Sequence, residues 1–304
     1  MNIAILGATS HIAKGLIFNF SKHTDYKVFL FARSTDNVTR FINENNINNN
    51  SMVVDFNDFY KFNYDCIINC IGISRTGNIS EVIELTEKYD SFIIAYLEKN
   101  NECLYINFSS GAVYSDLDKL QENRTTALHE ADNKPQNYYS IAKLYSETKH
   151  RSLSNFNIVD IRLFAYFSRF IDLNSAYLIT EILKSIINKT VLITNSDNII
   201  RDYSHPYDLF SLILKCINKK YLNEVYDTYS KNPISKFELL NFYSKIYGLQ
   251  YIIDEKLLFN NPTGQKKYYF SNNHKAEEIG FLPKYSSMKA IEIESEFILN
   301  NKYI

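Results

Sequence analysis

Tryptophan is absent from this chain of 304 residues, and only 4 cysteines and 8 glycines occur in it. The cysteines are Cys66, Cys70, Cys103 and Cys216, and they have none of the spacings of a metal site. We therefore expect no metal. A chain of this length also buries enough apolar surface to fold without a disulfide.

Long apolar runs and an excess of one charge are missing too. No run approaches the roughly 18 apolar residues of a membrane span, and the net charge is −1. We expect no membrane partner, and the near-neutral charge argues against nucleic acid. The first 22 residues have the pattern of a strand, a turn and a helix rather than of a signal peptide. The expected location is the cytoplasm.

What the sequence does contain is an alternation of apolar strands with helices. Strands are expected at residues 2–6, 27–31, 52–54, 66–71, 104–108 and 158–164, with helices ending near residues 21, 99 and 151. Such strands indicate a parallel, doubly wound α/β sheet. From about residue 165, helices at about 174–188, 206–218, 235–247 and 286–299 alternate with short strands such as 190–193. This looser pattern predicts a smaller α/β lobe.

Tyr139 and Lys143 form the most informative pair of residues. They are four residues apart on a predicted helix, so both side chains lie on one face. A neighbouring ammonium favours the phenolate form of a tyrosine. A serine at the end of the preceding strand, Ser109 or Ser110, can hold a carbonyl or hydroxyl oxygen against the phenol. This combination suits proton transfer in alcohol and ketone chemistry, beside a hydride acceptor. Tyr138 does not have the four-residue spacing and is expected to pack.

A dinucleotide site is predicted at the turn after the first strand. Gly7, Thr9, Ser10, His11 and Ile12 lie where a pyrophosphate binds at a helix N-terminus. The spacing matches Gly-x-x-Gly-x-x-Gly, with Ser10 in place of the second glycine and alanine in place of the third. The context therefore predicts the site more strongly than the motif does, and a Rossmann-type domain is expected over residues 1–164.

The end of the second strand favours NADP(H) over NAD(H). NAD sites have an acidic residue here for the ribose 2′-hydroxyl; this chain has Ala32, then Arg33 and Ser34, which suit a 2′-phosphate. Asp55 and Phe56 can bracket adenine. The alternatives are that Arg33 is an ordinary surface arginine and that Asp55 is a solvated acid in a loop.

Several ordered motifs resemble those of one enzyme group. Ser109–Tyr114 is similar to Ser-Ser-x-x-Val-Tyr, and Tyr139 and Lys143 match Tyr-x-x-x-Lys, preceded by Pro135 at the usual spacing. Arg201–Leu209 resembles Arg-Asp-Tyr-x-His-x-x-Asp, and Gly280–Pro283 resembles Leu-Gly-Trp-x-Pro. Over nearly its whole length the chain resembles the extended short-chain dehydrogenase/reductases, specifically the NAD(P)-dependent nucleotide-sugar epimerase/dehydratase/reductase group.

The resemblance implies roles for individual residues. Alignment on Val113 and Tyr114 makes Ser110 the catalytic serine beside Tyr139 and Lys143. Further cofactor contacts are implied for the residues after the fourth and sixth strands, Ile71, Gly72 and Phe164. Substrate contacts are implied for Ser110, Gly111, Ala165 and Arg201, with Arg201 binding the pyrophosphate of a nucleotide sugar. Lys266, which follows Thr263 and Gly264, can contact a phosphate; the alternative is a lysine in a solvated loop. His205 and Arg162 are expected to be structural. Residues 165–304 become the substrate-binding lobe, from which the chain can cross back, and a homodimer is expected.

The sequence is compatible with two activities and one binding role. The first is reduction of a keto nucleotide sugar by NADPH, with hydride to a carbonyl such as C4 and a proton from Tyr139. The second is epimerisation at C4, and the third is a non-catalytic NADP(H)-binding regulator. Gly111 and Ala112 follow Ser110 where a dehydratase needs an acid pair. Arg33 and the short chain favour the reductase, within a pathway such as polysaccharide biosynthesis.

Overall fold

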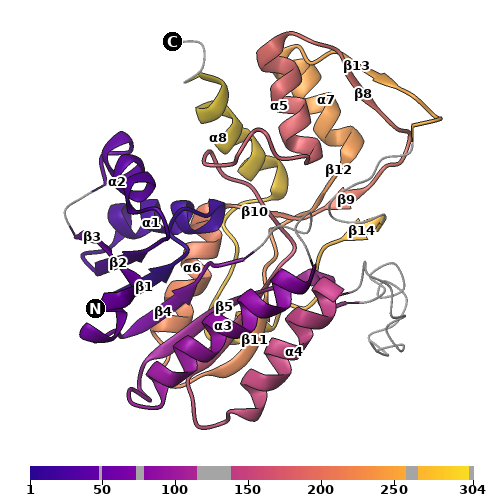
Figure 1. The fold of residues 1–304 in the computed structure, drawn as a ribbon. Helices are drawn as coiled ribbons and strands as arrows, with labels where there is room; N and C mark the ends of the chain where they lie inside the picture. The colour runs from indigo at the N-terminus through magenta and orange to yellow at the C-terminus, as the bar shows by residue number, and fades with distance from the viewer. Residues whose placement is uncertain (48–49, 73–78, 115–137, 258–265, 301–304) are drawn as a thin grey trace.

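The computed structural model describes residues 1–47, 50–72, 79–114, 138–257 and 266–300. Pro135 and the Thr263-Gly264 pair lie outside these ranges, as does the side chain of Tyr138. The chain folds into a large sheet layer and a smaller lobe beside it (Figure 1).

The large layer is a parallel sheet of seven strands in the described residues, in the order β11-β6-β5-β4-β1-β2-β3. Its strands are β1 (Asn2–Leu6), β2 (Lys27–Phe31), β3 (Ser51–Val54), β4 (Cys66–Asn69), β5 (Leu104–Ser110), β6 (Ile158–Leu163) and β11 (Asn223–Asp227). Strand β5 is buried along its whole length, as expected of a strand covered on both faces. The α/β, doubly wound fold class is confirmed.

Helices cover both faces of this sheet. One face packs against α1 (His11–His23), α2 (Thr35–Glu44) and α6 (Pro206–Ile217), and the other against α3 (Ile79–Leu97) and α4 (Tyr138–Ser152). Helix α6 and strand β11 follow the start of the smaller lobe in sequence, so the chain returns to the large layer before it finishes the lobe.

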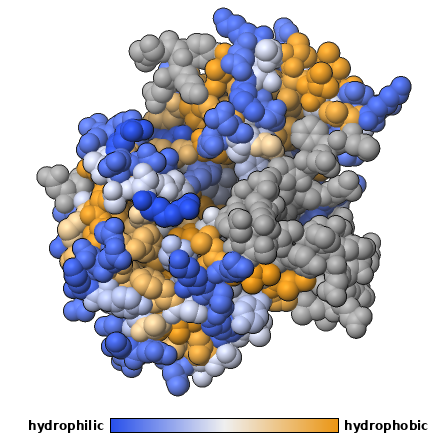
Figure 2. Space-filling view, viewed as in Figure 1, coloured by the Kyte–Doolittle hydropathy of each residue, from blue (hydrophilic) through white to orange (hydrophobic). Residues whose placement is uncertain are grey.

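The smaller lobe has its own core, formed mainly by three helices. These are α5 (Leu178–Asn188), α7 (Lys236–Tyr247) and α8 (Ser287–Asn300). Short strands connect them: β7 (Ala165–Tyr166) pairs with β10 (Tyr203–Ser204), β8 (Leu192–Thr194) with β13 (Tyr251–Ile253), and β9 (Ile200–Arg201) with both β12 (Ile234–Ser235) and β14 (Tyr268–Tyr269). Figure 2 shows hydrophobic surface over this lobe, where Val191, Ile193, Ile246 and Ile252 are exposed.

Two boundaries and one helix differ from the sequence expectation for local reasons. Strand β4 ends at Asn69 rather than at residue 71, because the Asn69 side-chain oxygen accepts the N–H of Ile71 and turns the chain. Helix α5 begins at Leu178 rather than near residue 174, because the Thr180 hydroxyl oxygen accepts the N–H of Tyr177. Helix α2 was not expected; Ser34 caps it. Among the described residues, no helix has the length and hydropathy of a membrane span.

Candidate active site

The turn between β1 and α1 requires glycine at residue 7. Gly7 has a φ of 74°, and a Cβ there would lie 2.9 Å from the backbone of Cys70 and Ile71. The close approach brings the ends of β1 and β4 together. Ser10 caps α1, since its hydroxyl oxygen accepts the N–H of Ala13 at 3.3 Å. The first turn of a helix leaves N–H groups without intrahelical partners, which suits an anion at this position.

A first cavity of about 800 Å³ opens beside this turn. It brings together the predicted cofactor residues Gly7, Thr9, Ser10, Arg33, Ser34, Phe56, Ile71 and Gly72. Arg33 is exposed at its edge, and the Ser34 hydroxyl oxygen accepts the N–H of Asn37. Glu84, Lys88 and Tyr89 of α3 also border it, although the sequence analysis did not single them out. Asp55 is not among the described residues that line it; its carboxylate accepts the N–H of Asn57 at 2.7 Å.

A second cavity, of about 370 Å³, adjoins the first. The two cavities share Ser10, Cys70, Ile71 and Gly72. The second is also lined by the predicted site residues His11, Ile12, Ser110, Tyr139, Lys143, Phe164, Ala165 and Arg201. Residues far apart in sequence, from the large layer and from the smaller lobe, therefore meet around this second cavity.

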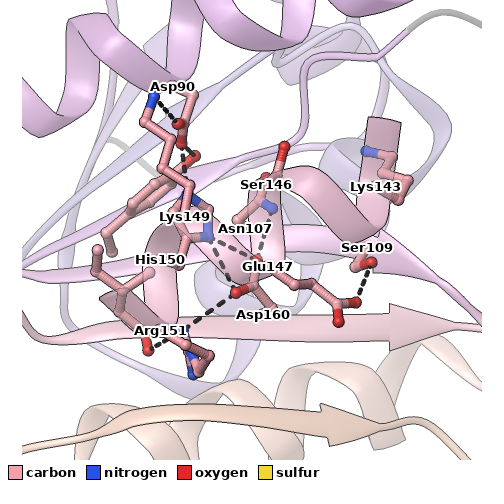
Figure 3. A network of polar contacts seen from close by, with 12 residues as sticks. Asp90, Asn107, Ser109, Lys143, Ser146, Glu147, Lys149, His150, Arg151 and Asp160 are labelled. Carbon is pink, nitrogen blue, oxygen red and sulfur yellow. Dashed lines mark hydrogen bonds and ion pairs between the residues drawn. The ribbon is translucent and has the colours of Figure 1, made fainter. Parts of the chain in front are cut away.

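The two serines at the end of β5 differ in their contacts. The Ser110 hydroxyl lies 3.2 Å from the Tyr269 hydroxyl, and its oxygen accepts the N–H of Ala112. Ser109 instead donates to Glu147 at 2.5 Å, as Figure 3 shows. Both serines line the second cavity, but the Ser109 hydroxyl is bonded to Glu147, which favours Ser110 as the serine available to a substrate.

Tyr139 and Lys143 lie one turn apart on α4, as their spacing predicted. The Lys143 ammonium donates to the carbonyl of Phe108 at 2.8 Å and lies 5.9 Å from the centre of the Tyr139 ring. The bond to β5 holds the lysine beside the end of the strand that carries Ser110. A hydroxyl, a phenol and an ammonium around one cavity can bind a carbonyl oxygen and deliver a proton to it.

Arg201 lines the second cavity from the smaller lobe and is buried. Its guanidinium donates to the carbonyl of Ile200 at 2.8 Å and lies 5.7 Å from the centre of the Tyr269 ring. The nearby carboxylates have other partners: Asp202 accepts from Ser230 and Ser287, and Asp208 accepts the N–H groups of Lys284 and Tyr285. Those carboxylates brace the C-terminal segment.

Two predicted substrate residues lie apart from the cavity lining. Lys266 donates to the carbonyl of Tyr114 at 2.7 Å. A Cβ on Gly111 would lie 2.5 Å from the Phe164 ring, so Gly111 serves close packing. Neither residue is among the described residues that line the two cavities.

Two residues expected to be structural have structural contacts. The His205 ring caps α6, since Nδ1 accepts the N–H of Tyr207 at 3.0 Å. Arg162 forms an ion pair with Glu147 at 2.6 Å.

Tyr269, which contacts Ser110, was not predicted from the sequence. No motif marks it, and strand β14 has only two residues. Its position follows from pairing, because β14 places Tyr269 opposite Arg201 on β9. Tyr166 was also missed: it lines the second cavity and packs edge-on against His11, with ring centres 4.8 Å apart. Burial lowers the pKa of His11 to about 4, so this imidazole is neutral at pH 7.

Comparisons with known proteins identify the family and the fold. Residues 3–230 match the sequence profile described as the NAD dependent epimerase/dehydratase family. No curated protein sequence matched the chain.

Solved structures share the fold over almost the whole chain. A dTDP-glucose 4,6-dehydratase from Bacillus anthracis, in complex with NAD, has a TM-score of 0.78 at 16% identity, covering 100% of this chain and 98% of its own. A UDP-glucuronic acid 4-epimerase from Bacillus cereus, with UDP-glucuronic acid and NAD, has a TM-score of 0.73 at 16% identity, covering 99% and 100%. A UDP-N-acetylglucosamine 4-epimerase from Methanobrevibacter ruminantium has a TM-score of 0.74 at 17% identity, covering 99% and 98%. At these identities the likeness establishes the fold.

Proposed function

The chain belongs to the NAD dependent epimerase/dehydratase family, and we propose that it is an NADPH-dependent reductase of a keto nucleotide sugar. The observation that carries the proposal is the single cavity lined by Ser110, Tyr139 and Lys143 from the large layer and by Arg201 from the smaller lobe. The arrangement suits a substrate that has both a carbonyl and a charged pyrophosphate.

The first cavity fits a dinucleotide. It begins at the capped N-terminus of α1, and Gly7 leaves the turn without a side chain. Arg33 and Ser34 would hold a ribose 2′-phosphate, and Ile71 and Gly72, which border both cavities, would lie beside the nicotinamide half. When bound, the cofactor supplies a hydride. The absence of a carboxylate at Ala32 is our reason to favour NADP(H); the solved relatives named above bind NAD.

The residues of the second cavity bind the substrate and transfer the proton. Ser110 donates a hydrogen bond to the substrate carbonyl oxygen, and Tyr139 gives that oxygen its proton. Lys143, held by Phe108, stabilises the tyrosine after the proton has left. Arg201 binds the pyrophosphate through paired N–H donors.

A 4-epimerase is the second candidate, and it is favoured by two solved relatives that are 4-epimerases, one of them in complex with NAD. An epimerase keeps its cofactor bound and returns the hydride to the other face of the sugar. A dehydratase is disfavoured, because Gly111 and Ala112 follow Ser110 in a buried turn with no carboxylate on either residue.

The test combines binding with turnover. A thermal-shift panel of UDP-, GDP-, dTDP- and CDP-sugars, with and without NADPH, identifies the nucleotide, because a ligand of the native state raises the melting temperature. Oxidation of NADPH is then followed with the matching keto sugar. Tyr139→Phe should bind the cofactor normally and lose roughly 10²–10⁴ in kcat.

The outcomes separate the candidates. A Tyr139→Phe variant that keeps more than about half of kcat contradicts the assigned proton donor. Tightly bound NAD together with interconversion of 4-epimers supports the epimerase. Cofactor binding without turnover of any substrate supports the regulator.

We also propose a homodimer. Ile83 of α3 and Ile141 and Tyr145 of α4 are exposed apolar side chains on two helices that pack together. Light scattering would give the mass in solution, and a monomer at micromolar concentration would contradict this proposal.

A further inference from the structure

Helix α4 carries a third functional position after Tyr139 and Lys143. Glu147 follows Lys143 by four residues, so the three side chains lie along one face of the helix. Its side chain is only 4% exposed. A buried carboxylate requires partners, and the proposed mechanism gives this one no task.

The partners of Glu147 come from the strands that end at the active site. Oε1 accepts from the Ser109 hydroxyl at 2.5 Å and from Arg162 Nε at 2.9 Å, and Oε2 accepts from Arg162 Nη2 at 2.6 Å. Ser109 and Arg162 are register partners on β5 and β6. Figure 3 shows Glu147 extended toward Ser109, on the same helix as Lys143. One carboxylate thus joins α4 to two neighbouring strand ends.

The network continues around Ser110 into the smaller lobe. Arg162 Nη1 donates to the Tyr114 hydroxyl at 2.8 Å, and that hydroxyl donates to Asp227 of β11 at 2.9 Å. Asp227 also accepts from Ser271. Ser271 is two residues beyond Tyr269, the residue whose hydroxyl contacts Ser110. The network therefore connects both sides of the catalytic serine.

We propose that Glu147 is a positioning residue that fixes the end of β5, with Ser110, against the helix face that presents Tyr139 and Lys143. The effect on kcat that we expect from this positioning rests on the proposed function. The geometry depends on the charge, because two oxygens accept three donors. In Glu147→Gln the amide nitrogen faces an N–H group of the Arg162 guanidinium in either orientation, so the paired geometry is lost.

A matched control exists elsewhere in the molecule. Glu294 of α8 is 2% exposed and binds Arg169 in the same two-pronged way, at 3.0 Å to Nε and 2.7 Å to Nη2. Glu294→Gln removes the same chemistry without contact to Ser109, Tyr139 or Lys143. Both variants should lower the melting temperature. A difference between them in kcat therefore reports the positioning of the catalytic groups and not the loss of stability.

The expected results are kinetic and structural. Glu147→Gln should lower kcat by ~10–100-fold, the scale of a small misplacement of catalytic groups, with the cofactor Kd changed by less than about 2-fold. Glu294→Gln should keep kcat. Ser109→Ala should lower kcat modestly in wild type and add nothing in the Glu147→Gln background, because both changes break one linkage. Should Glu147→Gln fail to fold, Ser109→Ala, which keeps the Arg162 pair, carries the test.

Crystal structures of the wild type and the Glu147→Gln or Ser109→Ala variant provide a readout that needs no substrate. The distance between Ser110 Oγ and Tyr139 Oη should change by roughly 0.5 Å or more. Equal loss of melting temperature with unchanged kcat in the Glu147 and Glu294 variants would overturn the proposal. So would an unchanged distance, even if no substrate is found and the proposed function fails.

Discussion

At the scale of single residues, we expect the choice of cofactor to depend on Arg33. This guanidinium is exposed at the edge of the first cavity, and it follows Ala32, the first residue after β2. We predict that Arg33→Asp shifts the kcat/KM preference from NADPH toward NADH by ~1–3 kcal/mol, because the charge-assisted pair with the 2′-phosphate becomes a repulsion. Arg40→Asp on α2, equally exposed but away from the cavity lining, is the charge control. Identical cofactor ratios in both variants would remove Arg33 from cofactor recognition.

Substrate binding is expected to depend on Arg201 at this scale. Arg201→Ala should weaken nucleotide-sugar binding by roughly 10–150-fold, the cost of a charged hydrogen bond of ~1.5–3 kcal/mol, and leave the NADPH Kd unchanged. Isothermal titration with free nucleoside diphosphates measures this directly. A lower melting temperature with an unaltered nucleotide Kd would instead make Arg201 a brace for the lobe.

At the scale of elements, α4 is held to the sheet by buried charges as well as by apolar contacts. His150 lies between Asp160 at 2.9 Å and Asp90 at 2.6 Å (Figure 3). Burial opposes the charged ring, but the bonds to Asp160 and Asp90 prevail and raise the pKa of His150 to about 9. Lys149, Arg151 and Tyr105 also face this pair of carboxylates.

The alkaline stability of the protein should follow from this site. Because the pKa of His150 is higher in the folded chain than the unfolded value of 6.5, its contribution is complete below pH 6.5 and is lost as the pH rises through about 9. The loss is of the order of 3 kcal/mol. Denaturant unfolding between pH 6 and 10 measures it, with imidazole NMR shifts to follow the ring. A His150 ring that is neutral at pH 7.5 would contradict the prediction.

At the scale of the whole molecule, the pair of Arg169 and Glu294 ties α8 to the segment that follows β7. Burial alone would raise the pKa of Glu294, but the bonds from Arg169 prevail and lower it to about 2. The folded pKa is below the unfolded value, so this contribution is present above about pH 4.5 and is lost as the pH falls toward 2. Glu294→Gln should flatten the acid limb of the stability curve by roughly 3 kcal/mol. Acid unfolding identical to wild type would refute this.

The sequence predicted most of the large layer, because most of its strands are short, mainly apolar runs and the signal is local. It predicted Tyr139 and Lys143 through helical spacing, and the turn at Gly7 through its place between a strand and a helix. Strand β11 was not predicted, because Asn223 and Glu224 give it a polar pattern. Its place at the edge of the sheet comes from pairing with β6. The short strands of the smaller lobe have two or three residues each, too few for any periodicity.

The sequence by itself determined the chemistry: a phenol and an ammonium one helical turn apart, a serine at a strand end and a dinucleotide turn. The tertiary structure alone decided what surrounds that chemistry. It bonded Ser109 to Glu147, placed Tyr269 against Ser110 and set the two cavities side by side. Neighbours along the chain are set by local geometry, which sequence spacing encodes. Contacts between residues more than a hundred positions apart depend on how the large layer and the smaller lobe pack together, and no local sequence pattern encodes that packing.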